Sequence, residues 1–205
     1  MTFGIIIDND YLRTLPQYKG KPDSELTAKD RSNVAVQVQN TYQAEATKHL
    51  DELKSDFGNG ISCMIRVYNA SGDRIKVHFT HSWKGGFYKD APEEFVENRQ
   101  WAAFMHVKLA AAAKGCTGAV VYRTAADTDV MVSWQCPRAA GSDPTCWAES
   151  RAKDHWRNTV TPEFAESVLY GLAKNRNIFT EAGYEVAINI GDNLSPYCEA
   201  VIRKA

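Results

Sequence analysis

The sequence feature that most constrains the fold is a change of hydrophobic period at Gly58-Asn59-Gly60. Before this point, apolar residues recur at steps of three or four, which is the spacing of one face of a helix. Thr27 and Asp30 stand where a capping box begins such a helix, and the glycines at 58 and 60 are suited to end it. The pattern predicts helix from Thr27 to Phe57, in one piece or in two joined near Tyr42. The residues of the apolar face are Val34, Val38, Tyr42, Ala46, Leu50, Leu53 and Phe57.

Beyond Gly60 the hydrophobic period is two, the repeat of a β-strand. Ile75, Val77 and Phe79 alternate with polar residues, as in a strand that has one face in water. We expect this strand to form a hairpin with the strand before it, across the turn-forming residues 69–73. The strand candidates are 61–69, 75–80, 101–109, 117–123, 130–135, 184–190 and 197–202.

Many short strands with helices set apart from them predict a mainly β fold of the α+β class, an antiparallel β-sandwich. Residues 1–57 are expected to form an N-terminal arm that packs on the sandwich of residues 58–205. The arm is predicted to be extended over 1–22 and helical after it. Thr161-Pro162-Glu163 begins a short helix in the C-terminal half. Residues 137–158 are polar and rich in turn formers, so we predict a long surface excursion there.

Charge and hydropathy argue against two kinds of partner. Lys and Arg number 24 and Asp and Glu number 25, and the resulting net charge of -1 lacks the positive field that nucleic acid binding needs. No segment reaches the roughly 18 apolar residues that indicate a membrane span. The N-terminus also lacks the basic and apolar regions of a signal peptide. We therefore predict a cytoplasmic protein with no transmembrane segment and no nucleic acid partner.

The cysteines agree with a reducing compartment. Their number is odd, their spacing is irregular, and no C-x-x-C pair is present. The leading interpretation is that all are free thiols that act as small apolar residues. The alternative is a disulfide between Cys136 and Cys146 across the loop that joins them. The five cysteines are Cys63, Cys116, Cys136, Cys146 and Cys198.

No motif in the sequence predicts a reaction. The sequence leaves open whether the chain is an enzyme and favours a protein that is not one. His81 and His106 are the weak candidates for a catalytic histidine. His78 and His81 are three residues apart, which on a strand directs their side chains to opposite faces, so no metal site is predicted. Serine-nucleophile and phosphate-binding glycine motifs are absent from the sequence, and no cofactor is expected.

Aromatic residues give the strongest signal for a binding surface. Trp101 and Trp134 lie inside strand candidates and are expected in the core, whereas Trp83, Trp147 and Trp156 are expected on the surface or in loops. The alternative for Trp83 is that it points inward together with Phe87 and closes the core. The candidate ligand-binding residues are Trp83, Phe87, Tyr88 and Trp147.

Several short segments have a recognisable order along the chain. They are Leu15-Pro16-Gln17-Tyr18-Lys19-Gly20, His81-Ser82-Trp83-Lys84-Gly85-Gly86-Phe87-Tyr88, Asn98-Arg99-Gln100-Trp101-Ala102-Ala103-Phe104-Met105-His106-Val107, Gly118-Ala119-Val120-Val121-Tyr122-Arg123, Ser133-Trp134 and Ile190-Gly191-Asp192. Over nearly the whole chain they resemble the plant 23 kDa jasmonate-induced protein family. The resemblance implies a plant stress and defence protein that accumulates in response to jasmonate and is cytosolic. It implies no settled reaction, so no residue is carried over as catalytic.

Three functions stay open at this point. The leading hypothesis is a non-enzymatic defence protein that binds a small molecule or a carbohydrate. A second is an enzyme or a chaperone of specialised metabolism that uses His81 or His106. A third, which rests on architecture alone, is a lipid- or membrane-surface binder similar to the aegerolysins. Neither the ligand nor the oligomeric state follows from the sequence.

Overall fold

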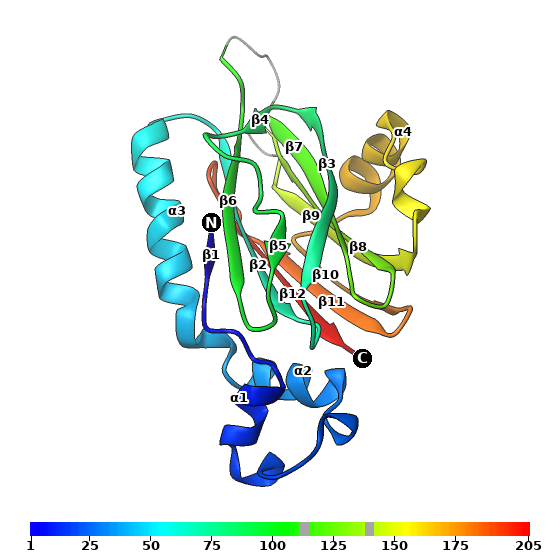
Figure 1. The fold of residues 1–205 in the computed structure, drawn as a ribbon. Coiled ribbons are helices and arrows are strands. Elements are labelled where there is room, and N and C mark those ends of the chain that lie inside the picture. Colours follow the sequence, from blue (N-terminus) through cyan, green and yellow to red (C-terminus); the bar gives the residue numbers. More distant parts are fainter. Residues whose placement is uncertain (111–114, 138–141) are drawn as a thin grey trace.

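The strands form two sheets that face one another, over the residues that the computed structural model describes, 1–110, 115–137 and 142–205 (Figure 1). Sheet A has the order β1-β6-β2-β12-β11-β10, with β4 paired to β6, and sheet B has the order β5-β3-β7-β8-β9. The predicted mainly β sandwich is confirmed. The strands of sheet A are β1 (Thr2–Phe3), β2 (Ser62–Ala70), β4 (Gly86–Phe87), β6 (Trp101–Val107), β10 (Arg176–Glu181), β11 (Tyr184–Ile190) and β12 (Tyr197–Lys204). Those of sheet B are β3 (Ile75–Lys84), β5 (Phe95–Val96), β7 (Cys116–Arg123), β8 (Thr128–Cys136) and β9 (Thr145–Ala152).

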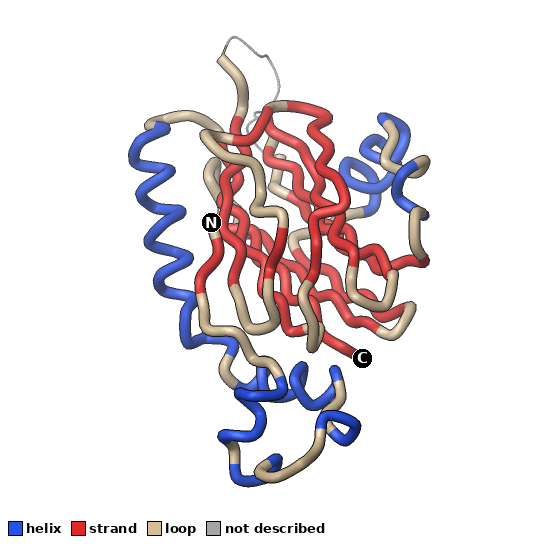
Figure 2. Tube along the Cα trace, in the orientation of Figure 1, coloured by secondary structure: helices blue, strands red, loops and turns tan. Residues whose placement is uncertain are grey.

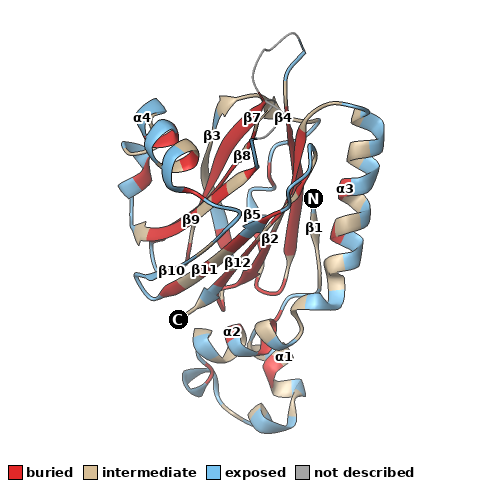
Figure 3. Ribbon diagram, turned by 180° about the vertical axis from the view of Figure 1, so that it is seen from behind, coloured by how far each residue is buried: buried red, intermediate tan, exposed pale blue. Residues whose placement is uncertain are grey.

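Alternate residues of the strands fill the space between the sheets, which accounts for the period of two in the sequence. In β2 these residues are Cys63, Ile65 and Val67. Trp134 of β8 enters the same core, and Trp101 of β6 is buried on the opposite face of sheet A. Both tryptophans are fully buried, as predicted. Figure 3 shows that burial is concentrated on the strands.

The N-terminal arm covers the outer face of sheet A (Figure 2). Its helices are α1 (Asn9–Thr14), α2 (Ala28–Gln37) and α3 (Gln43–Phe57), with a 3₁₀ turn (Gln39–Tyr42) between the last two. The capping box of Thr27 and Asp30 is present, and Gly58 ends α3 at a φ of 80°. Leu12, Val34 and Leu50 pack with Trp101 and its neighbours. The prediction of an extended segment over 1–22 is wrong, because Asp8 caps α1 by accepting a hydrogen bond from the Tyr11 backbone N–H.

A second helical cover lies on the outer face of sheet B. It consists of a 3₁₀ turn (His155–Arg157), α4 (Pro162–Phe164) and a π-helix (Ala165–Leu172). Thr161 caps α4 and Pro162 occupies its first position, as the sequence predicts. Trp156, Phe164 and Leu169 are buried against the sheet. Trp156 was predicted on the surface or in a loop; it lies in the connection after β9, but its side chain is buried and not on the surface.

Three strand predictions differ from the structure. β2 and β3 do not form a hairpin, because the chain crosses from one sheet to the other at the turn, where the Asn69 side-chain amide donates to the carbonyls of Asp73 and Val96. β2 pairs instead with β6 and, in parallel, with β12. The surface excursion predicted for 137–158 contains β9, paired to β8, while residues 138–141 lie outside the described part. β10, with its mixed polar sequence, was not among the strand candidates.

The five cysteines are free thiols and all are buried in the core between the sheets. Cys136 stands opposite Cys116 of β7, and Cys146 stands opposite Trp134, so the two cysteines of the alternative disulfide are not direct neighbours across the strands. Burial raises the pKa of the Cys146 thiol. The structure therefore agrees with the interpretation of these cysteines as small apolar residues.

Candidate functional site

The four aromatic residues predicted to bind a ligand lie in three different layers. Trp83, at the end of β3, packs under the cover of sheet B, where it stacks on Phe164 at 6.0 Å and donates from Nε1 to the Thr161 carbonyl at 2.8 Å. Trp147 of β9 borders the same cover. Phe87 instead packs into the core between the sheets.

Tyr88 lies on the far side of sheet A, where its hydroxyl donates to Asp56 of α3 at 2.8 Å. The structure therefore brings Trp83 and Trp147 to one face and separates both from Phe87 and Tyr88. Two register shifts in the pairing of β3 with β7, at Val77–Phe79 and at Ser82–Lys84, change the direction of the side chains there. The separation itself arises because β3 belongs to sheet B while β4, which carries Phe87, pairs with β6 of sheet A.

The two candidate catalytic histidines have different surroundings. His106 is fully buried, and its Nε2 lies 2.9 Å from the Ser82 hydroxyl oxygen. Burial lowers the pKa of His106 to about 3, so its imidazole is neutral and weakly basic. Within the described part of the chain, its Nδ1 has no hydrogen-bond partner to orient it. His81 packs edge-on to Trp83 at 4.7 Å, and burial lowers its pKa as well.

His78, Asp129 and Asp154 lie close enough together to resemble a metal site. The guanidinium of Arg123 binds both carboxylates of this group. It donates to both carboxylate oxygens of Asp129 at 2.8 and 2.9 Å and to Asp154 at 2.7 Å. These hydrogen bonds also hold the pKa of Asp154 below its ordinary value. Because Arg123 already engages both carboxylates in charge-assisted hydrogen bonds, the group fits an ion-pair network.

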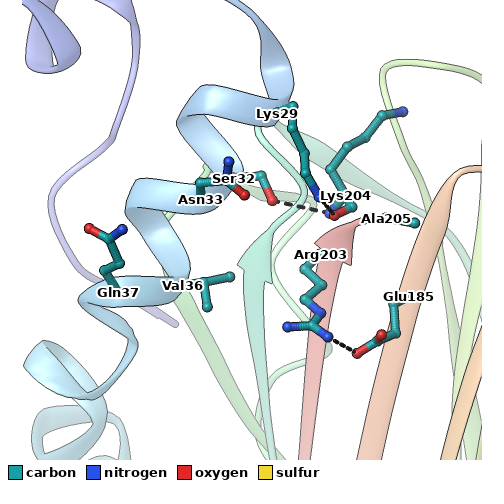
Figure 4. Close-up of a pocket in the computed structure, with 9 residues that line it drawn as sticks. All are labelled: Lys29, Ser32, Asn33, Val36, Gln37, Glu185, Arg203, Lys204 and Ala205. Atoms are coloured by element: carbon teal, nitrogen blue, oxygen red, sulfur yellow. Dashed lines mark hydrogen bonds and ion pairs between the residues drawn. The ribbon is translucent and has the colours of Figure 1, made fainter. Parts of the chain in front are cut away.

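An open groove lies between α2 and the ends of β11 and β12, with a volume of about 570 Å³ (Figure 4). The helix contributes five residues at the spacing i, i+3, i+4, i+7 and i+8, which places them on one face. The strands contribute Glu185 and Arg203, which stand opposite each other in the register of β11 and β12. The helix residues that line the groove are Lys29, Ser32, Asn33, Val36 and Gln37.

Two hydrogen bonds join the walls of the groove. Lys29 donates from Nζ to the Lys204 carbonyl at 2.9 Å, and the Lys204 backbone N–H donates to the Ser32 hydroxyl at 3.2 Å. Arg203 forms an ion pair with Glu185 at 2.7 Å, and the Arg203 side chain remains 45% exposed. The groove is lined by three basic residues, Lys29, Arg203 and Lys204, together with the Glu185 carboxylate and several amide or hydroxyl groups.

Sequence reasoning missed this groove. The polar face of α2 is a signal in the sequence, since the five residues from Lys29 to Gln37 follow the helical spacing. Nothing local indicates that Arg203, at the other end of the chain, lies across from them. The pairing of β12 with β2, which α2 also contacts, brings the two segments together.

The fold and the groove together define the class, a β-sandwich protein with a helical arm and an open surface groove large enough for a small ligand. In the described residues, no helix is long and apolar enough to span a membrane. A family model for Nakanori-like proteins matches residues 3–205, and the chain belongs to that family.

Comparisons with individual proteins agree with this assignment. The chain is 29% identical over 180 residues to the 23 kDa jasmonate-induced protein of Hordeum vulgare, covering 84% of this chain and 85% of the relative. This confirms the resemblance found from short segments of the sequence. The crystal structure of the lipid binding protein Nakanori superposes with a TM-score of 0.93 at 32% identity, covering 98% of this chain and 99% of that one. The Xerocomus chrysenteron lectin XCL, at 12% identity and a TM-score of 0.51, shares the fold over 70% of this chain.

Proposed function

We propose that this protein is a non-enzymatic lipid-binding protein and that the groove beside α2 receives the polar headgroup of the lipid. The observation that carries the proposal is the match to the lipid binding protein Nakanori, with 32% identity and a TM-score of 0.93 over 98% of the chain. A match of this extent includes the helical arm as well as the sandwich. It supports the third function considered from the sequence, a lipid- or membrane-surface binder.

The chemistry of the groove supports a headgroup as the ligand. A phosphate oxygen accepts hydrogen bonds from guanidinium and ammonium groups, which Arg203 and Lys29 supply. Glu185 restrains the Arg203 guanidinium at 2.7 Å, and Val36 adds an apolar wall. A volume of about 570 Å³ lies in the range of small-ligand sites and leaves the acyl chains outside the groove.

The biological setting is part of the proposal. The barley relative is named as a jasmonate-induced protein, and its 29% identity supports a role of this chain in the plant stress response. A carbohydrate or another small molecule as the ligand is an alternative outcome of the binding test below. The cytoplasmic location stays a prediction from the sequence.

The test is co-sedimentation of the full-length protein with vesicles of phosphatidylcholine and phosphatidylserine, beside vesicles of a galactolipid that carries no phosphate. We expect binding to the phospholipid vesicles. Arg203→Gln and Lys29→Gln should each weaken it about tenfold, the effect of losing one charge-assisted hydrogen bond. Arg176→Gln, an exposed arginine of β10 outside the groove, is the matched control and should bind like the parent. Equal binding by the parent and the groove variants would refute the groove as the headgroup site. No binding to any vesicle would refute the lipid-binding function.

A further inference from the structure

Arg99 is a buried arginine with an unusual environment. Arg99 is only 7% exposed. Its backbone φ is 76°, a conformation that residues other than glycine rarely adopt. The guanidinium lies near two aromatic rings, 5.3 Å from the centre of Tyr11 and 5.4 Å from that of Tyr42. Tyr11 belongs to α1 and Tyr42 to the turn before α3, so these cation–π contacts form only when the arm is folded.

The charge of Arg99 has no protein counter-ion. Among the residues that the structure describes, no carboxylate forms an ion pair with it, and its Nε is buried without a hydrogen-bond partner. Within the described residues its two terminal nitrogens donate no hydrogen bond, and 7% of the residue's surface remains exposed. A buried cation without an anion is costly, and an anion from outside could approach these nitrogens.

Two exposed isoleucines lie in the segment that runs beside the backbone of Asn98 and Arg99. Ile5 is 58% and Ile6 is 41% exposed, in contrast to the fully buried Ile7. The residues on either side of them contact the segment of Arg99. Ile7 exchanges hydrogen bonds with Asn98 at 3.2 and 2.9 Å, and a Cβ added to Gly4 would lie 2.7 Å from the Arg99 carbonyl oxygen. Both ends of the segment 4–7 are therefore fixed to the backbone that carries Arg99, and the two isoleucines between these ends are exposed.

We propose that Ile5, Ile6, Tyr11, Tyr42 and Arg99 form a membrane-contacting patch in which Arg99 binds the phosphate of a phospholipid. This inference rests on the proposed lipid-binding function and adds a second contact to it. An arginine fork matches a phosphate group, tyrosines suit the boundary between water and hydrocarbon, and isoleucine side chains gain free energy by entering the apolar region. Such a combination is complementary to one lipid molecule with its phosphate and acyl chains.

The patch and the groove can face the same membrane. α2 lies between them, since the Arg31 carbonyl of this helix accepts a hydrogen bond from Asn98 while Lys29 and Ser32 line the groove. Figure 1 shows that α1, α2 and the end of β12 all lie at one end of the sandwich. The exposed acids Asp8 and Asp10 follow the patch. The patch is therefore not a general cationic surface, and it fits recognition of a single phosphate better than attraction to a strongly anionic membrane.

The first test uses the double variant Ile5→Ser with Ile6→Ser and the phosphatidylcholine–phosphatidylserine vesicles named above. Because both side chains are exposed, the variant should fold like the parent, and its affinity for vesicles should fall about tenfold. Leu194→Ser is the matched control. This leucine is 66% exposed and adjoins Ser62, at the opposite end of sheet A, so its replacement should leave binding unchanged.

The second test compares Arg99→Gln with Arg99→Lys, and urea unfolding of each variant separates folding from binding. We expect Arg99→Gln to lose vesicle binding while it still unfolds cooperatively, and Arg99→Lys to keep part of it, since lysine retains the charge but not the planar fork. If the Arg99 variants do not fold, the isoleucine variant decides alone. Full binding by the isoleucine variant would overturn the patch as a membrane contact. Loss of binding by the control Leu194→Ser would overturn it as well.

The two proposals fail in different ways. Loss of binding in the groove variants with full binding in the patch variants would leave the lipid-binding function standing and overturn the patch. A parent protein that binds none of the vesicles would overturn both.

Discussion

His106 is a titratable side chain that is buried in the core between the sheets, and its burial lowers its pKa. Its ring lies edge-on to Phe87 at 5.1 Å and to Trp134 at 5.4 Å, in surroundings that cannot solvate a charge. The Ser82 hydroxyl is its hydrogen-bond partner, at 2.9 Å. The imidazole is therefore held in its neutral form, with a pKa of about 3 instead of the ordinary 6.5.

This depressed pKa predicts a loss of stability in mild acid. As the pH falls below 6.5, the unfolded chain binds a proton at this histidine and the folded protein does not, so the free energy of unfolding decreases until the pH approaches 3. Between pH 7 and pH 5 the histidine should account for about 2 kcal/mol, measured by urea unfolding at both values. In His106→Gln this part of the pH dependence should vanish, whereas in the exposed His155→Gln it should persist. An unchanged pH dependence in His106→Gln would contradict the assignment.

At the scale of an element, the helical cover of sheet B depends on a few aromatic contacts. The π-helix and α4 contact the sheet through Phe164 and Leu169, and Trp83 joins them from β3. The indole of Trp83 is half-buried and hydrogen-bonded to the Thr161 carbonyl, the residue that caps α4. Trp83 therefore links the end of β3 to the start of α4. The alternative in which Trp83 and Phe87 close the core together is wrong, because Trp83 packs under the cover of sheet B and Phe87 packs between the sheets.

Replacing Trp83 with alanine should therefore cost stability. We expect Trp83→Ala to lower the free energy of unfolding by about 2–3 kcal/mol, less than a fully buried tryptophan but more than a surface residue. Leu172→Ala is the control, because Leu172 lies in the π-helix and is 64% exposed. Thermal unfolding of the two variants beside the parent measures the difference. A Trp83→Ala variant as stable as Leu172→Ala would return Trp83 to the surface as a ligand contact.

At the scale of the whole molecule, the arm and the sandwich share an apolar layer. Residues from α1, α2 and α3 pack on the outer face of sheet A, around Tyr68 and Trp101. Tyr68 donates from its hydroxyl to the Ala35 carbonyl of α2 at 2.8 Å, and Trp101 donates from its indole to the Gln39 carbonyl at 2.9 Å. Both the proposed groove and the proposed patch lie where the arm contacts the sandwich.

Removal of residues 1–57 should leave the sandwich without this layer. We expect the fragment 58–205 to aggregate, because the apolar side chains of Tyr68, Trp101 and Met105 would be exposed together. Size-exclusion chromatography and circular dichroism of the fragment measure this directly. A soluble fragment with cooperative unfolding would show instead that the arm is an independent appendage.

The sequence alone determined the elements and the family. The helical period before Gly58 and the period of two after it are local properties, because each depends on which residues neighbour one another along a few turns or one strand. The helices α2 and α3, the start of α4 and most strands of the sandwich follow from these periods. The burial of Trp101 and Trp134 was predictable for the same reason.

The tertiary structure decided which elements meet. The period of a strand does not name its partner, so the parallel pairing of β12 with β2 and the crossing between β2 and β3 could not be derived from it. The crossing of the chain from β3 in sheet B to β4 in sheet A separated the predicted aromatic surface. The groove joins Lys29 to Arg203, and the patch joins Tyr11 and Tyr42 to Arg99. These sites depend on contacts between residues far apart in the chain, which packing creates and local sequence does not encode.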